Sequence, residues 1–143
     1  MRIDFYQLSR DPVEKVVPVL AQKALDSGAK LSLVCAGDAQ IAQLSDALWA
    51  QPGAFLAHGE GSDSRQPILI GAEASTANGA TIAIIADGEW RTGMDGIERA
   101  ILLFAPEQTV AARRLWSRLS GEGHDLRIFK QQDGGGWREG PGR

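Results

Sequence analysis

The side chains that most often carry catalysis or bind metals are few in this sequence. Cys35 lies inside an apolar run, and His58 and His124 lie far apart, each beside a glycine. Metal sites and Cys–His nucleophiles need side chains that converge and support one another. The carboxylates are also scattered singly, so the sequence offers no acid–base pair. We therefore expect no catalytic residue, no metal site and no cofactor, with Cys35 in the core and His58 holding its loop through a hydrogen bond.

The glycines do not form a phosphate-binding loop. Neither G-x-x-x-x-G-K-[ST] nor a G-x-G-x-x-G after the first predicted strand occurs. The glycines at 59 and 61 and at 134–136 lack the helix that follows such a loop. One place for a nucleotide or another small ligand is left open, at Ala36-Gly37-Asp38, because α/β folds bind ligands at the carboxyl ends of strands.

Composition describes an ordinary globular chain. The 143 residues are 43% hydrophobic and 23% charged, which fits one domain. A net charge of −3 and a pI of about 5.3 argue against a dedicated nucleic-acid binder. One cysteine cannot form an internal disulfide, and no apolar run has the length of a signal peptide or a membrane span. We expect a cytoplasmic protein.

Short apolar runs alternate with helical patterns. The runs predict strands over 2–8, 30–36, 67–71, 81–86, 100–104 and 125–131. Helices are predicted from Asp11 to Gly28, from Asp38 to about residue 50, and from Pro106 to Ser120, with Asp11 and Asp38 as N-caps. In the first of these, Pro18 either kinks the helix or delays its start.

The order of these elements predicts the fold class. Strands that alternate with helices favour a single three-layer α/β domain with a mainly parallel sheet, over residues 1–132. A flexible Gly-rich tail is expected over 133–143. Asn78-Gly79 between two strand-like runs indicates a hairpin, and residues 88–99 receive no assignment.

Two segments resemble a known family. Asp46–His58 has the order Leu-Trp, Pro, Phe-Leu and His that is similar to the DNA polymerase III chi subunit family. The segment from Ala111 to Leu126, in which Arg113 is followed three residues later by Trp116, resembles that family's late helix and final strand. Phe-Tyr-Gln-Leu near the start, Gly-Ala-Lys after the first helix and Gly-Gly-Trp near the end complete the resemblance, which spans nearly the whole chain.

The resemblance implies a fold like that of nucleotide-binding α/β proteins without a phosphate loop. It also implies an accessory subunit of DNA polymerase III in DNA replication, without catalysis of its own. Such an adaptor binds the acidic C-terminal tail of single-stranded DNA-binding protein. It reaches the clamp loader through a small partner called psi, and DNA only indirectly.

The same resemblance implies that Arg113, Trp116 and Arg114 bind the tail. Residues three apart on a helix are neighbours, and arginine can hold a carboxylate beside an apolar socket. The alternative is that Trp116 is core and the arginines only solvate a surface helix. Two further basic positions of the family's helix fall on Ser117 and Ser120 here.

A second surface is expected from large apolar residues in a loop rich in Pro and Gly, where they lie outside helical periodicity. The resemblance implies that they contact psi or the clamp loader: Trp49, Pro52, Phe55 and Leu56. The alternative is that Trp49 closes the core and Phe55 anchors the loop.

Two other functions stay open: a nucleotide- or small-molecule-binding α/β domain at 36–38, and a protein that stacks single-stranded DNA on Trp49, Trp116 and Trp137.

Overall fold

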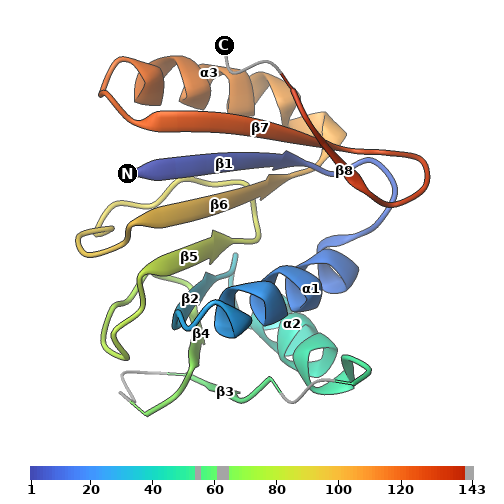
Figure 1. Ribbon diagram of the computed structural model, residues 1–143, viewed down its shortest axis with the longest axis vertical. Coiled ribbons are helices and arrows are strands. Elements are labelled where there is room, and N and C mark those ends of the chain that lie inside the picture. Colours follow the sequence, from blue (N-terminus) through green and yellow to red (C-terminus); the bar gives the residue numbers. More distant parts are fainter. Residues whose placement is uncertain (54–55, 61–64, 141–143) are drawn as a thin grey trace.

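The computed structural model describes residues 1–53, 56–60 and 65–140 and contains one sheet flanked by helices (Figure 1). The strand order is β3-β4-β2-β5-β6-β1-β7-β8, and each described strand pair is parallel except β7–β8. The strands are β1 (Arg2–Gln7), β2 (Leu31–Val34), β3 (His58–Gly59), β4 (Ile68–Gly71), β5 (Ile82–Ile85), β6 (Arg99–Phe104), β7 (Asp125–Gln131) and β8 (Trp137–Glu139). The helices are α1 (Val13–Asp26), α2 (Asp38–Ala50) and α3 (Thr109–Ser120), with a 3₁₀ turn, η1 (Pro106–Gln108), before α3.

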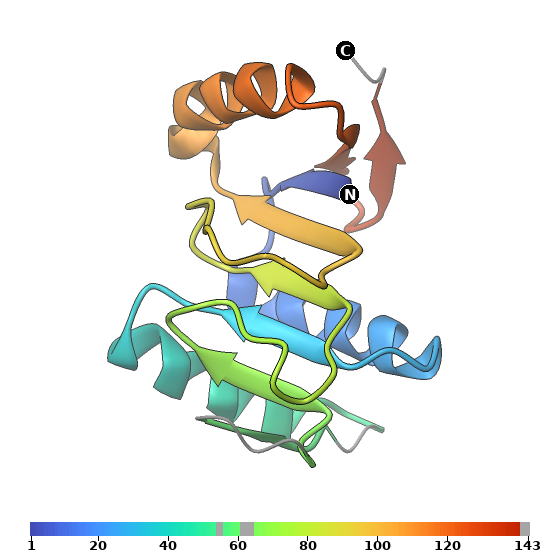
Figure 2. The same ribbon diagram turned by 90° about the vertical axis from the view of Figure 1, so that its left-hand side faces the viewer.

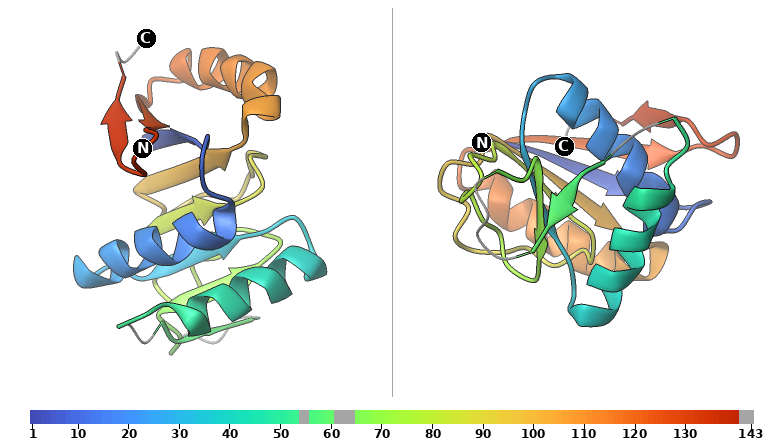
Figure 3. Two further views of the ribbon diagram at one scale, coloured as in Figure 1. Left: turned by 90° about the vertical axis from the view of Figure 1, so that its right-hand side faces the viewer. Right: turned by 90° about the horizontal axis from the view of Figure 1, so that it is seen from below.

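Helices cover both faces of the sheet, as the three-layer prediction requires. Side chains of β1 alternate, so that Tyr6 joins one core with α1 and α2, while Ile3 and Phe5 join a second core with α3. Figure 1 shows α3 at the β7 end of the sheet and α1 and α2 nearer the β3 end, and Figure 3 shows the helices from two other sides. The predicted fold class is therefore confirmed.

Strand β1 carries a buried carboxylate. Asp4 on β1 is 0% exposed and accepts from Arg2 at 2.9 Å and from Arg99 of β6 at 2.7 Å. A buried charge is tolerated when it is paired and hydrogen-bonded. The ion pair between Asp4 and Arg99 therefore joins β1 to β6, a strand about 100 residues later in the chain.

The starts of α1 and α2 differ from the prediction. Pro12 is the N-cap of α1 and Gly37 that of α2, and neither Asp11 nor Asp38 caps its helix. Asp11 instead accepts a hydrogen bond from Nε2 of Gln131, at 3.0 Å. Helix α1 begins at Val13 and includes Pro18, so its start is not delayed by a turn.

Gln131, at the end of β7, fixes the loop between β1 and α1. Its Oε1 accepts from three consecutive backbone N–H groups, those of Ser9, Arg10 and Asp11, at 3.2, 2.9 and 3.1 Å. Consecutive N–H groups of this kind often bind an anion. Here a side chain of the same protein fills that position, and it is 7% exposed.

The predicted hairpin at Asn78-Gly79 is wrong. Strands β4 and β5 are parallel, and β2 lies between them. The turn itself is present, with φ of +82° at Gly79 and a bond from its N–H to the carbonyl of Thr76. Asn78 is buried and donates to the carbonyls of Leu31 and Gln66. The Asn-Gly pair thus serves a crossover that returns the chain to the start of the next parallel strand.

Two segments that the sequence leaves unassigned or flexible are part of the fold. Met94 and Ile97, from the connection between β5 and β6, are buried in the core under α3, where a helix would be usual; Figure 2 gives another view of these connections. Within the expected tail, Trp137–Glu139 forms β8, which pairs with β7. Sequence reasoning also missed the two-residue strand β3.

No helix in the described part of the chain has the length and apolar character needed to cross a membrane.

We predict that Gln131→Met destabilises the protein. Methionine has a similar shape but removes the acceptor of three backbone N–H groups, so the free energy of unfolding should fall by about 3 kcal/mol. Urea unfolding followed by circular dichroism should show a lower midpoint with an unchanged m-value. Gln132→Met, in the exposed neighbour, should change stability by less than about 0.5 kcal/mol. Equal midpoints for the two variants would contradict the role given to Gln131.

Candidate partner-binding sites

Arg113 and Trp116 line one small cavity under α3. The cavity has a volume of about 180 Å³ and lies where β1, β6 and β7 end. Trp116 contacts Phe5 edge to face, with ring centroids 5.1 Å apart, and Phe5 contacts Phe104 at 6.4 Å. The lining residues are Phe5, Gln7, Phe104, Thr109, Ala112, Arg113, Trp116, Ile128 and Lys130. Three aromatic rings and two cations therefore line one cavity.

The charges of this cavity come from two elements. Arg113 lies on α3 and Lys130 on β7, both exposed. Within the described ranges, neither has a carboxylate at ion-pair distance. Pockets for whole small ligands usually measure about 300–1,000 Å³, so this one has the size of a single large side chain. The arrangement can bury one apolar side chain while a guanidinium or an ammonium holds a neighbouring carboxylate.

Sequence reasoning found part of this site. The structure brings Arg113 and Trp116 together, whereas Arg114 is exposed and outside the lining. Trp116 is half-buried, so it is both a core residue and a wall of the cavity. Lys130 was missed, although the alternation on β7 signals it: Leu126, Ile128 and Lys130 share the face that α3 covers.

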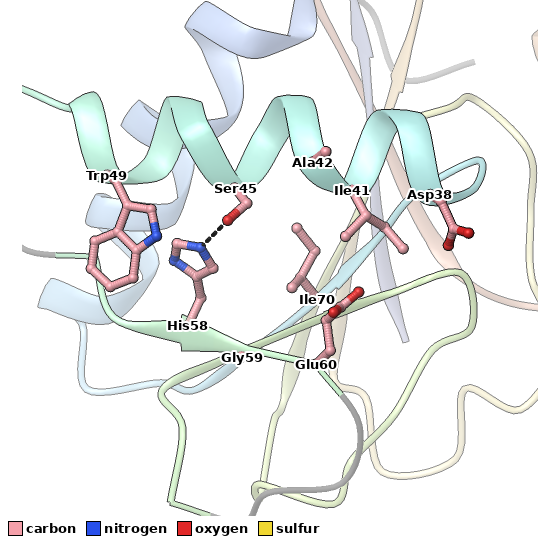
Figure 4. A pocket seen from close by; sticks show the side chains of 9 residues that line it. All are labelled: Asp38, Ile41, Ala42, Ser45, Trp49, His58, Gly59, Glu60 and Ile70. Carbon is pink, nitrogen blue, oxygen red and sulfur yellow. Dashed lines mark hydrogen bonds between the residues drawn. The ribbon is translucent and has the colours of Figure 1, made fainter.

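A second, larger cavity of about 590 Å³ runs along α2 beside β3 (Figure 4). Trp49, 52% exposed, lies at one end against His58, with ring centroids 4.5 Å apart. The imidazole is 2.7 Å from Ser45 Oγ through Nε2 and 2.8 Å from the Leu56 carbonyl through Nδ1. His58 therefore holds its loop by hydrogen bonds, as expected. Asp38 and Glu60 lie at the other end and make it acidic.

The predicted surface around Trp49 is only partly at the surface. Trp49 and Pro52 are exposed. Leu56 is 2% exposed and packs in the core with α1 and α2, so its side chain is not available to a partner in this structure. Phe55 lies outside the described residues.

At residues 36–38, the alternative ligand site, the backbone at the carboxyl ends of the strands forms hydrogen bonds with side chains of the same protein. The N–H of Ala36 donates to Gln40 Oε1 at 2.7 Å, and Gln40 Nε2 donates to the Ala86 carbonyl at 3.3 Å. Arg91 pairs with Asp87 at 2.7 Å and donates to the carbonyls of Cys35 and Ala72. These contacts weigh against a nucleotide at 36–38.

The three tryptophans of the stacking hypothesis do not form one track. Trp116 lies in the cavity under α3, Trp49 lies on α2, and Trp137 packs on the other face against Tyr6, with ring centroids 4.8 Å apart. A strand of bases would need neighbouring aromatic platforms, so this arrangement weighs against direct stacking of single-stranded DNA.

Cys35 is a core residue. It is 0% exposed, and burial together with nearby Asp87 raises the pKa of its thiol to about 12. A thiol that stays protonated is a poor nucleophile. Over residues 1–53, 56–60 and 65–140, no three His, Cys, Asp or Glu side chains gather in a way that could hold a metal ion.

Comparison with protein families decides the assignment. The model of the family described as DNA polymerase III chi subunit, HolC, matches residues 1–127. The chain belongs to the DNA polymerase III chi subunit family. The resemblance predicted from the sequence is thereby confirmed, and with it a role as an accessory subunit in DNA replication. The family match includes Arg113, Trp116 and Trp49, whereas Lys130 and β8 lie beyond it. A search among curated proteins gave no match.

We predict that Cys35 resists thiol reagents in the folded protein. With a pKa near 12 instead of 9.0, its thiolate fraction at pH 8 is about a thousandfold lower than in the unfolded chain. Reaction with Ellman's reagent should therefore be slower by orders of magnitude in buffer than in concentrated urea. Fast native labelling would show that Cys35 is accessible and ionised.

Proposed function

We propose that this chi-family protein is a non-catalytic adaptor of the cytoplasmic replication machinery. Its cavity at Arg113 and Trp116 would bind the acidic C-terminal tail of single-stranded DNA-binding protein. Its surface at Trp49 and Pro52, together with Phe55, would bind psi or the clamp loader. One observation carries the first assignment: Arg113, a cation with no described ion-pair partner, lines a cavity of about 180 Å³ together with three aromatic side chains.

The chemistry of the tail fits that cavity. In the family, the tail ends in an aromatic or apolar residue with a free carboxylate. Its last side chain would be desolvated against Phe5, Phe104 and Trp116, while Arg113 would hold the carboxylate. An interaction of one side chain and one charge is small, so moderate affinity and a marked dependence on salt are expected.

The location of the second surface supports an adaptor. The cavity at Trp116 adjoins β1, β6 and β7. The larger cavity at Trp49 adjoins β3 and β4, at the other end of the strand order. Two partners could therefore bind at once without competing for the same elements. Trp49, which is exposed in this cavity, is of a residue type enriched among the hot spots of protein interfaces.

We predict that Arg113→Ala weakens binding of a fluorescent peptide copied from the tail of the cognate single-stranded DNA-binding protein by about tenfold or more, measured by polarisation. Trp116→Ala should also weaken binding. Because Trp116 packs on Phe5, that variant also needs an unfolding curve, so the arginine variant is the decisive one. Raising the salt concentration should weaken wild-type binding.

The matched control is Arg114→Ala. It removes the same charge from the next residue of α3, outside the cavity, and should change the affinity by less than about twofold. If folded wild type did not bind the peptide, or if Arg113→Ala and Arg114→Ala behaved alike, the tail site would be wrong.

We predict that Trp49→Ala weakens binding to psi, or to the clamp loader where psi is absent, by about tenfold or more. Val19→Ala, another exposed apolar residue on a different helix, is the control and should bind normally. Co-elution in size-exclusion chromatography and titration calorimetry would measure both. Tail-peptide binding should stay unchanged in Trp49→Ala, and a loss of both activities would indicate misfolding instead.

A further inference from the structure

Strand β8 places another cation opposite Lys130. Strands β7 and β8 pair antiparallel, and Arg138 lies directly opposite Lys130. Trp137 and Glu139 flank Arg138 and belong to the other face, where Trp137 packs against Tyr6. Arg138 therefore shares the face of Lys130, which is the face of the cavity and of α3. Both side chains are exposed.

Two like charges directly opposite each other destabilise a strand pair. Across the described residues, no carboxylate lies within ion-pair distance of Lys130 or Arg138. Glu139, the nearest acid on β8, is opposite Phe129 and points to the other face. Among the described residues no carboxylate compensates this repulsion, and an anionic ligand on this face would relieve it.

The backbone holds this pair in place. Gln132 N–H donates to the Gly136 carbonyl at 2.7 Å, Gly135 N–H to the Gln132 carbonyl at 2.8 Å, and Gly140 N–H to the Ile128 carbonyl at 2.9 Å. These bonds close the hairpin before and after Arg138. Cations on a fixed strand pair lose less freedom on binding than cations on a loop.

We propose that Lys130 and Arg138 bind the acidic side chains that precede the C-terminal residue of a peptide seated in the cavity. The inference rests on the proposed tail site and adds a specificity: the cavity with Arg113 selects the apolar end and its carboxylate, and the β7–β8 hairpin selects acidic residues upstream. Charge complementarity carries it, because a chain that leaves the cavity past Lys130 meets Arg138 next. The hairpin cations lie beyond residue 127, where the family match ends.

The test uses the full chain and two fluorescent peptides with the same apolar C-terminal residue and free carboxylate. One carries three aspartates before that residue, and the other carries three asparagines. Lys130→Gln and Arg138→Gln should each weaken the aspartate peptide about three- to tenfold and reduce its salt dependence. Both should leave the asparagine peptide within about twofold of wild type. Arg113→Ala should weaken both peptides.

The matched control is Arg127→Gln, which removes one cation from β7 on the opposite face and should not discriminate between the peptides.

Normal binding of the aspartate peptide by both hairpin variants, with Arg113→Ala still defective, would overturn the hairpin site and leave the tail site standing. Equal weakening of both peptides would also overturn it. Failure of wild type to bind either peptide would overturn both proposals. Hairpin variants that lose only binding to an oligothymidine would assign these cations to nucleic acid and overturn the peptide assignment.

Discussion

The carboxamide of Gln131 is the contact on which both ends of the chain depend. It joins the last long strand, β7, to the three backbone N–H groups that lead from β1 into α1. The same strand brings Lys130, its neighbour, to the cavity under α3. One polar side chain thus fixes the exit of the first strand, the entry of the first helix and one wall of the candidate tail site. It also occupies the kind of N–H cluster that binds an anion in other proteins.

Side chains of the protein itself occupy much of the sheet edge formed by the carboxyl ends of the strands, and this limits where ligands can bind. Parallel α/β folds usually bind small molecules beyond the ends of their strands. In this chi-family protein, Gln40, Arg91 and Gln131 tie much of that edge to its own backbone. Two other places remain: a side-chain-sized cavity under α3 and a groove beside α2. The first has the volume of a single side chain, whereas the second has the volume of a small-ligand pocket but is acidic at one end, which disfavours an anionic nucleotide.

Local patterns predicted the helices, the long strands and the pairing of Arg113 with Trp116, because burial repeats along a helix or strand at a fixed period. They failed where distant contacts decide. Asn78-Gly79 predicts a hairpin, yet β2 enters between the two strands and makes the turn part of a crossover. Asp11 predicts a cap, yet Gln131 binds it. The glycines before Trp137 predict a flexible tail, yet the indole of Trp137 packs against the ring of Tyr6. Arg138 could not be placed opposite Lys130 without the register of β7 and β8.

The position of β1 in the sheet has a consequence for biosynthesis. Arg2 is the first residue of the strand, and its two partners across the sheet are Arg99 and Asp125. A ribosome adds about 5–20 residues per second, so the first strand waits about 5–20 s before the first of these partners exists. During that time, Ile3 and Phe5 lack the part of their core that β6, α3 and β7 supply. The nascent chain therefore leaves Ile3 and Phe5 incompletely covered until β7 has been synthesised. Such segments are the ones that chaperones bind and that aggregate when synthesis outpaces folding.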